Sequence, residues 1–197
     1  MYIIYMIEKE GSWVRVRGRM THLALLRGIN VGGKNPLPMK DLARMFEDAG
    51  CVNIRTYIQS GNVIFEAPAG APKVGEAVTR SVEKRFGYRI PVILRTLRQL
   101  QEAIRENPFL TAGADAKALH VYFLADLPSA SNCARLDANR SAPDAFYVRG
   151  REIYLHLPNG MARTKLTNAY FDSKLSTVST ARNWATVLKL AEMMAAR

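Results

Sequence analysis

The stretch Val52-Asn-Ile-Arg-Thr-Tyr-Ile-Gln-Ser-Gly-Asn-Val-Ile-Phe-Glu66 decides the fold class of this 197-residue chain. Residues 52–59 alternate in the manner of a β-strand, and residues 63–66 form a second, apolar strand. Between them, Ser60-Gly61-Asn62 consists of residues that tolerate a positive φ, as a tight turn requires. The stretch therefore predicts a β-hairpin.

A strand and a helix are predicted on each side of this hairpin. Before it, residues 22–27 form an apolar strand, and apolar residues recur at helical spacing between Pro38 and Gly50. After it, a helix is predicted over residues 74–86 and a strand over residues 88–95. The order βαββαβ is that of the ferredoxin-like plait, an antiparallel sheet with both helices packed on one face.

The second part of the chain repeats the opening of this order. Residues 119–157 contain a strand, a short helix and a hairpin around Gly150-Arg151, and two further helices are predicted at residues 165–175 and 184–194. We therefore predict an α+β fold with two ferredoxin-like halves. The predicted boundaries are residues 20–110 for the first half, which a helix over residues 97–106 closes, residues 111–116 for a Gly/Ala-rich linker, and residues 117–197 for the second half.

Residues 1–19 are predicted to be an extension outside the core, because the first plait strand begins directly after Met20. A misassigned start codon would explain such an extension. Residues 1–7 are apolar but lack a basic leader and a small-residue cleavage site, so they do not form a signal peptide. No apolar run approaches the roughly 20 residues that span a bilayer. Cys51 and Cys133 lie far apart without a CxxC motif, which favours a reducing compartment, and we predict a cytoplasmic protein.

The chain is strongly basic. Its 28 lysines and arginines against 17 aspartates and glutamates give a formal net charge of +11 at pH 7. Such a charge attracts phosphates, nucleic acids and anionic lipid surfaces. The partners that we expect are therefore a nucleic acid or a phosphorylated small molecule.

The loop after the first plait strand resembles part of a phosphate-binding P-loop. Gly28-Ile-Asn-Val-Gly-Gly-Lys34 fits the G-x-x-x-x-G-K pattern, but Asn35 stands where a P-loop needs Ser or Thr, and Pro36 removes an N–H donor. A weaker hypothesis is an anion nest formed by Arg27, Lys34 and the glycine amides. The alternative is a tight turn with a solvated Lys34.

Two other polar clusters are candidates for ligand contact. Tyr57, Gln59, Ser60 and Asn62 lie on the first hairpin, where they either bind a ligand or shape the turn. Arg163, Lys165, Asn168 and Arg182 lie near the predicted starts of the last two helices, and helix starts favour anions. The alternative there is that Thr164 or Thr167 and Asn183 cap these helices and Trp184 anchors the core.

The sequence indicates no catalytic residue, metal ligand set or cofactor. It contains no HExxH or GxSxG motif and no carboxylates at a spacing suited to paired acid and base work.

Four strings carry a family resemblance: residues 24–35, residues 55–65, residues 163–168, and Thr180-Ala-Arg-Asn-Trp184. Through them the chain resembles the bacterial family catalogued as domain of unknown function 1697, over about residues 20–190. The resemblance implies the paired α+β plait architecture. Because strings from both halves are polar and cationic, it also suggests a groove that the two halves share.

Three hypotheses for function follow. The first is a protein that binds an anionic ligand, either a nucleic acid or a phosphorylated small molecule, in a cationic groove between the halves. The second is an enzyme that acts on a phosphorylated or carboxylated metabolite. The third is that the polar motifs only hold the two halves together. The residues predicted to contact the ligand are Arg27, Asn30, Lys34, Asn35, Tyr57, Gln59, Ser60, Asn62, Arg163, Lys165, Asn168 and Arg182.

Overall fold

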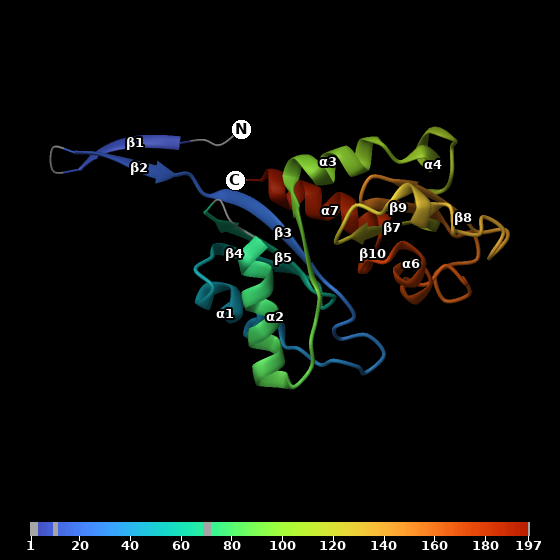
Figure 1. Cartoon of the computed structure of the whole chain (residues 1–197), viewed down its shortest axis with the longest axis horizontal. Helices are drawn as coiled ribbons and strands as arrows, with labels where there is room; N and C mark the ends of the chain where they lie inside the picture. The colour runs from blue at the N-terminus through green and yellow to red at the C-terminus, as the bar shows by residue number, and fades with distance from the viewer. Residues whose placement is uncertain (1–3, 10–11, 69–71, 197) are drawn as a thin grey trace.

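The computed structural model describes residues 4–9, 12–68 and 72–196, and it confirms the α+β fold with two ferredoxin-like halves (Figure 1). The first plait consists of β3 (Met20–Leu26), α1 (Met39–Asp48), β4 (Val52–Tyr57), β5 (Asn62–Ala67), α2 (Pro72–Phe86) and β6 (Val92–Thr96). The second consists of β7 (Leu119–Leu124), α5 (Ala130–Cys133), β8 (Ala145–Arg149), β9 (Glu152–His156), α6 (Asn168–Leu175) and β10 (Ser179–Asn183).

The two antiparallel sheets have the same topology. Their strand orders are β4-β5-β3-β6 and β10-β7-β9-β8, so in each plait the first and third strands lie in the centre. In the first plait, α1 and α2 cover one face and share a core with Val63 and Phe65. In the second plait, α6 packs on the corresponding face through Phe171.

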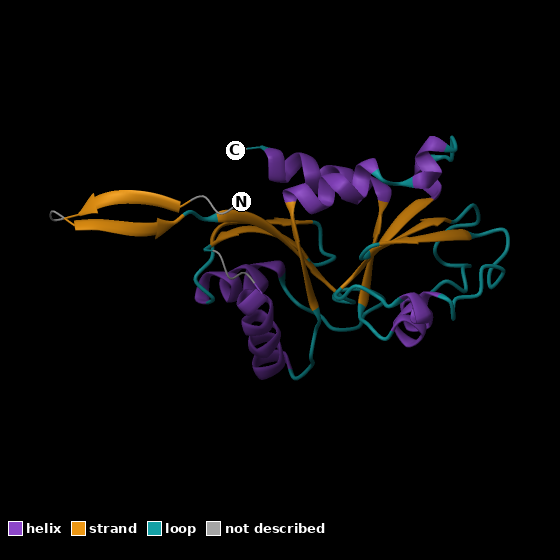
Figure 2. Ribbon diagram, turned by 45° about the horizontal axis from the view of Figure 1, so that its top comes forward, coloured by secondary structure: helices purple, strands orange, loops and turns teal. Residues whose placement is uncertain are grey.

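Each plait is followed by one more helix that covers the opposite face of the sheets. These helices are α3 (Leu97–Arg105) and α7 (Trp184–Ala195), which lie side by side across both sheets (Figure 2). Leu23 and Leu25 of β3 face this shared core, whereas Ala24 and Leu26 face α1 and α2. Because both faces are covered, β3 is a continuous apolar run rather than an alternating one.

Strand β10 is absent from the sequence prediction, which placed only a connection between the last two helices. Its sequence, Ser-Thr-Ala-Arg-Asn, has no apolar run. It becomes a strand because it pairs with β7 and because Ser179, Thr180 and Arg182 are buried against other polar groups. This strand completes the second plait.

The helices of the second plait are shorter than predicted. Helix α5 ends at Cys133, and α6 begins at Asn168 because the Thr167 hydroxyl caps it by accepting a hydrogen bond from the Tyr170 amide. Asn183 caps α7 in the same way.

The N-terminal strands β1 (Ile4–Lys9) and β2 (Ser12–Arg17) form a hairpin that projects away from the sheets (Figure 1). In the parts of the chain that the structure describes, this hairpin adds no strand to either sheet. Of the other residues of the predicted extension, 18–19 lead into β3, and 1–3 and 10–11 lie outside the described residues. The predicted linker, residues 111–116, is turn and loop over residues 112–115. It is flanked by the short helix α4 (Pro108–Thr111) and a 3-10 turn, η1 (Ala116–Ala118). None of the described helices is long and apolar enough to cross a membrane.

Candidate functional site

The two plaits are joined by a buried arginine that belongs to the second and binds the first. Arg182 of β10 donates from Nη2 to the carbonyls of Leu26, Ser60 and Gly61, and from Nε to Oδ1 of Asn62. Its Nη1 donates within β10, to the Thr180 hydroxyl and the Ala181 carbonyl. All three guanidinium nitrogens are therefore engaged by acceptors of the protein.

Arg95 of β6 makes the reciprocal contact, from the first plait to the second. It lies two residues before α3, as Arg182 lies two residues before α7. Its Nη2 donates to the carbonyl of Leu124, the last residue of β7, at 2.9 Å, and Nη2 of Arg182 donates at 2.9 Å to Leu26, the last residue of β3. We call Arg95 and Arg182 the arginine clasps.

The clasps differ in the partner that Nε contacts. Arg95 donates to the carboxylate of Glu152, the first residue of β9, whereas Arg182 donates to the neutral amide of Asn62, the first residue of β5. Burial lowers the pKa of Arg182 to about 10, and this value leaves the group protonated at neutral pH. Burial also lowers the pKa of Arg95, and Glu152 opposes that effect.

The asparagines of the predicted site stabilise the loops around the Arg182 clasp. Asn62 donates to the carbonyl of Tyr57 and the hydroxyl of Ser60, and Asn35 donates to the carbonyl of Gly28. Asn30 donates to the carbonyls of Leu37 and Gln59 and accepts from the Leu37 amide. These asparagine side chains therefore order the loop and the hairpin.

A second polar chain runs from the first plait into α6. Arg27 forms an ion pair with Asp172, whose other carboxylate oxygen accepts from the Ser179 hydroxyl at 2.6 Å. Asn168 completes the chain by donating to the carbonyl and the hydroxyl of Ser179. Together with the clasps, these contacts are of the kind that the third hypothesis describes.

The structure thus brings five predicted residues into the joint between the plaits: Arg27, Ser60, Asn62, Asn168 and Arg182. Four other predicted residues are exposed at the surface: Lys34, Gln59, Arg163 and Lys165. Tyr57 is half-buried and packs against the core that α3 and α7 share.

Beside the joint, the two plaits enclose a cleft of about 730 Å³. Its charged lining consists of Arg80, Arg89, Arg95, Arg151, Glu76 and Asp126, and we call it the arginine cleft. Helix α2 and β6 of the first plait form one wall, and the end of β7 with the β8–β9 hairpin forms the other. Four guanidinium groups and two carboxylates line the cleft, and Arg95 is already paired with Glu152 beside it. The cations that a ligand could contact are therefore Arg80, Arg89 and Arg151.

The cleft is open because of small residues. Arg27 and Ala125 occupy equivalent positions, because Arg27 directly follows β3 and Ala125 directly follows β7. The Arg27 amide donates a hydrogen bond to the carbonyl of Pro91, and the Ala125 amide donates one to the carbonyl of Val178. Arg27 bridges to Asp172 of α6, but Ala125 is too short to bridge to α2. Gly75 of α2, which lines the same cleft, also has no side chain to fill it.

Gly75 provides a first prediction. It lies inside a helix, and a Cβ added there would meet Val92 at 3.7 Å and Leu94 at 3.8 Å, which are ordinary contacts. Since glycine costs helix stability relative to alanine, we expect Gly75→Ala to raise the free energy of unfolding by about 0.5–1 kcal/mol. Urea unfolding measures this change, and a fall in stability would contradict it.

The sequence prediction missed the lining of the arginine cleft. Its arginines come singly from a helix, a loop, a strand and a hairpin, and so form no motif. One signal in the sequence was the equivalence of positions in the two halves. Arg95-Thr96 directly precedes a helix, as Arg182-Asn183 does, and Gly150-Arg151 lies in a hairpin turn, as Ser60-Gly61 does. Among the residues that the structure describes, no group of three or more His, Cys, Asp and Glu side chains could hold a metal ion.

Comparison with known proteins agrees with this fold. Residues 20–154 match the family described as "Protein of unknown function (DUF1697)". No curated protein matches the chain. Among solved structures, the chain is similar to the conserved bacterial protein SP0830 from Streptococcus pneumoniae, with a TM-score of 0.63 and 20% identity, covering 90% of this chain and 99% of that one. At this identity the similarity concerns the fold alone.

Proposed function

The chain belongs to the family of proteins of unknown function DUF1697, and we propose that it binds a small phosphorylated ligand in the arginine cleft. The observation that carries the proposal is a cleft between the two plaits that is lined by Arg80, Arg89 and Arg151, none of which is held by a close ion pair within the described part of the chain. Arginine binds phosphate oxygens in pairs through its planar fork of N–H donors.

The four arginines differ in how firmly they are held. Arg95 is a clasp whose position is set by buried hydrogen bonds and whose charge is paired with Glu152, so it shapes the wall and leaves ligand contact to the other three. Arg80 and Arg89 pair only loosely with Glu76 and Glu83, at 3.8 and 3.7 Å, and their side chains are largely exposed. Exposed ion pairs of this kind contribute little, so both groups can turn toward a ligand at small cost.

Arg151 extends the cationic lining to the second plait. Its Nη1 lies 3.5 Å from the carbonyl oxygen of Ala125, which is a long contact for a hydrogen bond. A phosphorylated ligand that contacts Arg89 and Arg151 would therefore touch both plaits.

The size of the cleft favours a small molecule over a nucleic acid. Its volume lies within the range of roughly 300–1,000 Å³ that is usual for small-ligand pockets. A nucleic acid would instead need cations along an extended surface. In this proposal, Arg182 and the asparagines around it hold the plaits in place and do not touch the ligand.

The test is calorimetric titration with pyrophosphate and with ATP, at low and at physiological salt. We expect saturable binding, and we expect Arg89→Gln and Arg151→Gln each to weaken it by about tenfold, the factor that 1.4 kcal/mol represents. Arg98→Gln is the matched control, because Arg98 is an exposed arginine of α3 outside the cleft, paired loosely with Glu102.

Two results would overturn the proposal. One is the absence of binding by either probe at low salt. The other is binding that the two cleft variants leave as tight as Arg98→Gln does. Titration with a single-stranded oligonucleotide completes the test: if it binds the cleft variants as tightly as the unaltered protein, the anion site lies on another surface.

A further inference from the structure

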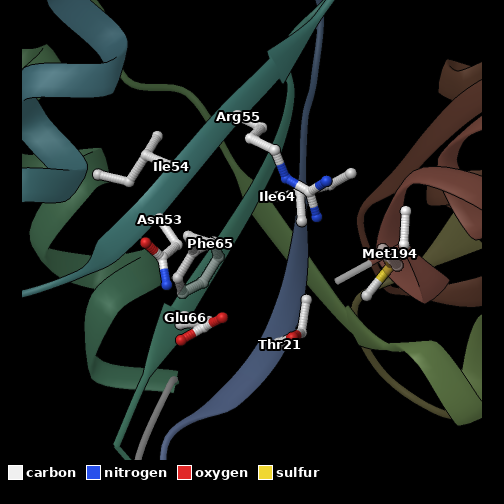
Figure 3. A pocket seen from close by; sticks show the side chains of 9 residues that line it. Thr21, Asn53, Ile54, Arg55, Ile64, Phe65, Glu66 and Met194 are labelled. Atoms are coloured by element: carbon white, nitrogen blue, oxygen red, sulfur yellow. The ribbon is translucent and has the colours of Figure 1, made fainter.

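A second cavity lies on the first plait, between its sheet and the C-terminal end of α7 (Figure 3). Its volume is about 740 Å³. The sheet contributes Thr21 from β3, Arg55 from β4, and Ile64 and Glu66 from β5, and α7 contributes Met194. We call this cavity the Arg55 pocket.

The strand register places these side chains on one face of the sheet. Arg55 lies opposite Ile64, and Glu66 lies opposite Thr21. Side chains two residues apart on a strand share a face, so Glu66 lies on the face of Ile64, which packs in the core that contains Met194. A bulge in β4 between Val52 and Arg55 interrupts the edge strand beside this face.

The pocket is lined by one cation and one anion, Arg55 and Glu66, which form no ion pair with each other. None of the ion pairs formed within the described residues includes Arg55 or Glu66. Their strand positions are diagonal neighbours, whose Cα atoms are typically about 7–8 Å apart. Figure 3 shows the two charged ends apart, with Ile64 beside Arg55 and Met194 across the pocket.

In the second plait, the corresponding face is covered by the chain itself. His156 is the fifth residue of β9, as Glu66 is the fifth residue of β5. The ring of Phe109, from α4, packs against His156 with 5.8 Å between the ring centroids. The first plait has Glu66 at this position and an open pocket beside it.

We infer that the Arg55 pocket binds a small zwitterion with an apolar side chain, of the amino-acid class. The guanidinium of Arg55 binds the carboxylate, and Glu66 binds the ammonium group. The apolar side chain lies over the small exposed parts of Ile64 and Met194, which are 1% and 5% exposed. The hydroxyl of Thr21, opposite Glu66, is placed to accept a further ammonium hydrogen. This inference is independent of the anion site in the arginine cleft.

Titration of ¹⁵N-labelled protein with L-leucine and with L-methionine, followed by NMR, tests the inference. We expect saturable shifts in the amide signals of residues 53–55 and 64–66. N-acetyl-L-leucine lacks the ammonium group and L-leucinamide lacks the carboxylate, so each should bind at least about tenfold more weakly. Arg55→Gln and Glu66→Gln should each weaken L-leucine binding by a similar factor.

Glu47→Gln is the matched control, since Glu47 is an exposed carboxylate on α1, and it should bind L-leucine as the unaltered protein does. The dispersion of the amide signals reports whether each variant is folded. The inference is overturned if neither amino acid shifts these signals, if the two derivatives bind as well as L-leucine, or if folded Arg55→Gln binds it unchanged.

Discussion

Arg182→Met lowers the free energy of unfolding by about 2–4 kcal/mol. The substitution leaves the carbonyl of Ser60 and Oδ1 of Asn62 without the donor that they have in the native protein. A buried polar group without a partner costs about 1–3 kcal/mol, and the shorter methionine leaves packing space as well. Relief from burying a charge offsets part of this loss.

Urea unfolding, followed by circular dichroism, measures this effect. Arg163→Met is the control, because Arg163 is exposed and substitutions at such positions usually change stability by less than about 0.5 kcal/mol. Arg182→Lys should also be destabilising, since one ammonium group replaces a planar fork that contacts both the hairpin and β3. If Arg182→Met is as stable as Arg163→Met, the clasp does not stabilise the joint.

Gly61→Ala should destabilise the protein by about 2–5 kcal/mol. Gly61 has a φ of +75°, and an added Cβ would lie 2.7 Å from Cβ of Leu26 and 3.0 Å from Cδ1 of Ile29. The positive φ costs alanine about 1–2 kcal/mol, and overpacking of a filled site costs about 1–3 kcal/mol more. The same change should move the Gly61 carbonyl, which accepts from the Leu26 amide and from Arg182.

The other hairpin provides a matched control. Gly150 also has a positive φ, of +58°, but an added Cβ would meet only a carboxylate oxygen of Glu152, at 3.7 Å. Gly150→Ala should therefore show the backbone cost alone, about 1–2 kcal/mol. The difference between the two variants in thermal or urea unfolding isolates the packing against Leu26, and equal effects would show that this packing is not tight.

The joint and the arginine cleft share a residue, because Arg95 is both a clasp and part of the cleft wall. A ligand in the cleft would therefore lie against a wall whose position depends on the contact between the plaits. This is a physical reason to expect the function of this fold at its joint, where the two halves together set the width and the charge of the cleft.

Much of the fold could be predicted from local patterns. The alternation on each side of Ser60-Gly61-Asn62 and the helical spacing before Gly50 predicted the first plait, and the structure confirms it. Strand β10 could not be found in this way, because its polar residues look like a loop until β7 and the clasp contacts are in place. The family predicted from four strings is confirmed by a match over residues 20–154, which contain the first two of these strings.

The roles of the polar residues depend on distant parts of the chain. The acceptors that Arg182 meets in the first plait lie 120 to 156 positions away in sequence, and no local pattern encodes such a pairing. The arginine cleft likewise collects single arginines from four separate elements.

By itself, the sequence determined the secondary structure of the first plait, the repeated architecture and the basic charge, since periodicity, turn residues and composition are local properties. Only the tertiary structure decided which arginines have their N–H donors engaged at the joint between the plaits and which have donors free to meet a ligand in the cleft. The physical reason is that a guanidinium group buried among carbonyls and one exposed to solvent have the same sequence letter, and only the packing around each determines whether its N–H donors are already engaged.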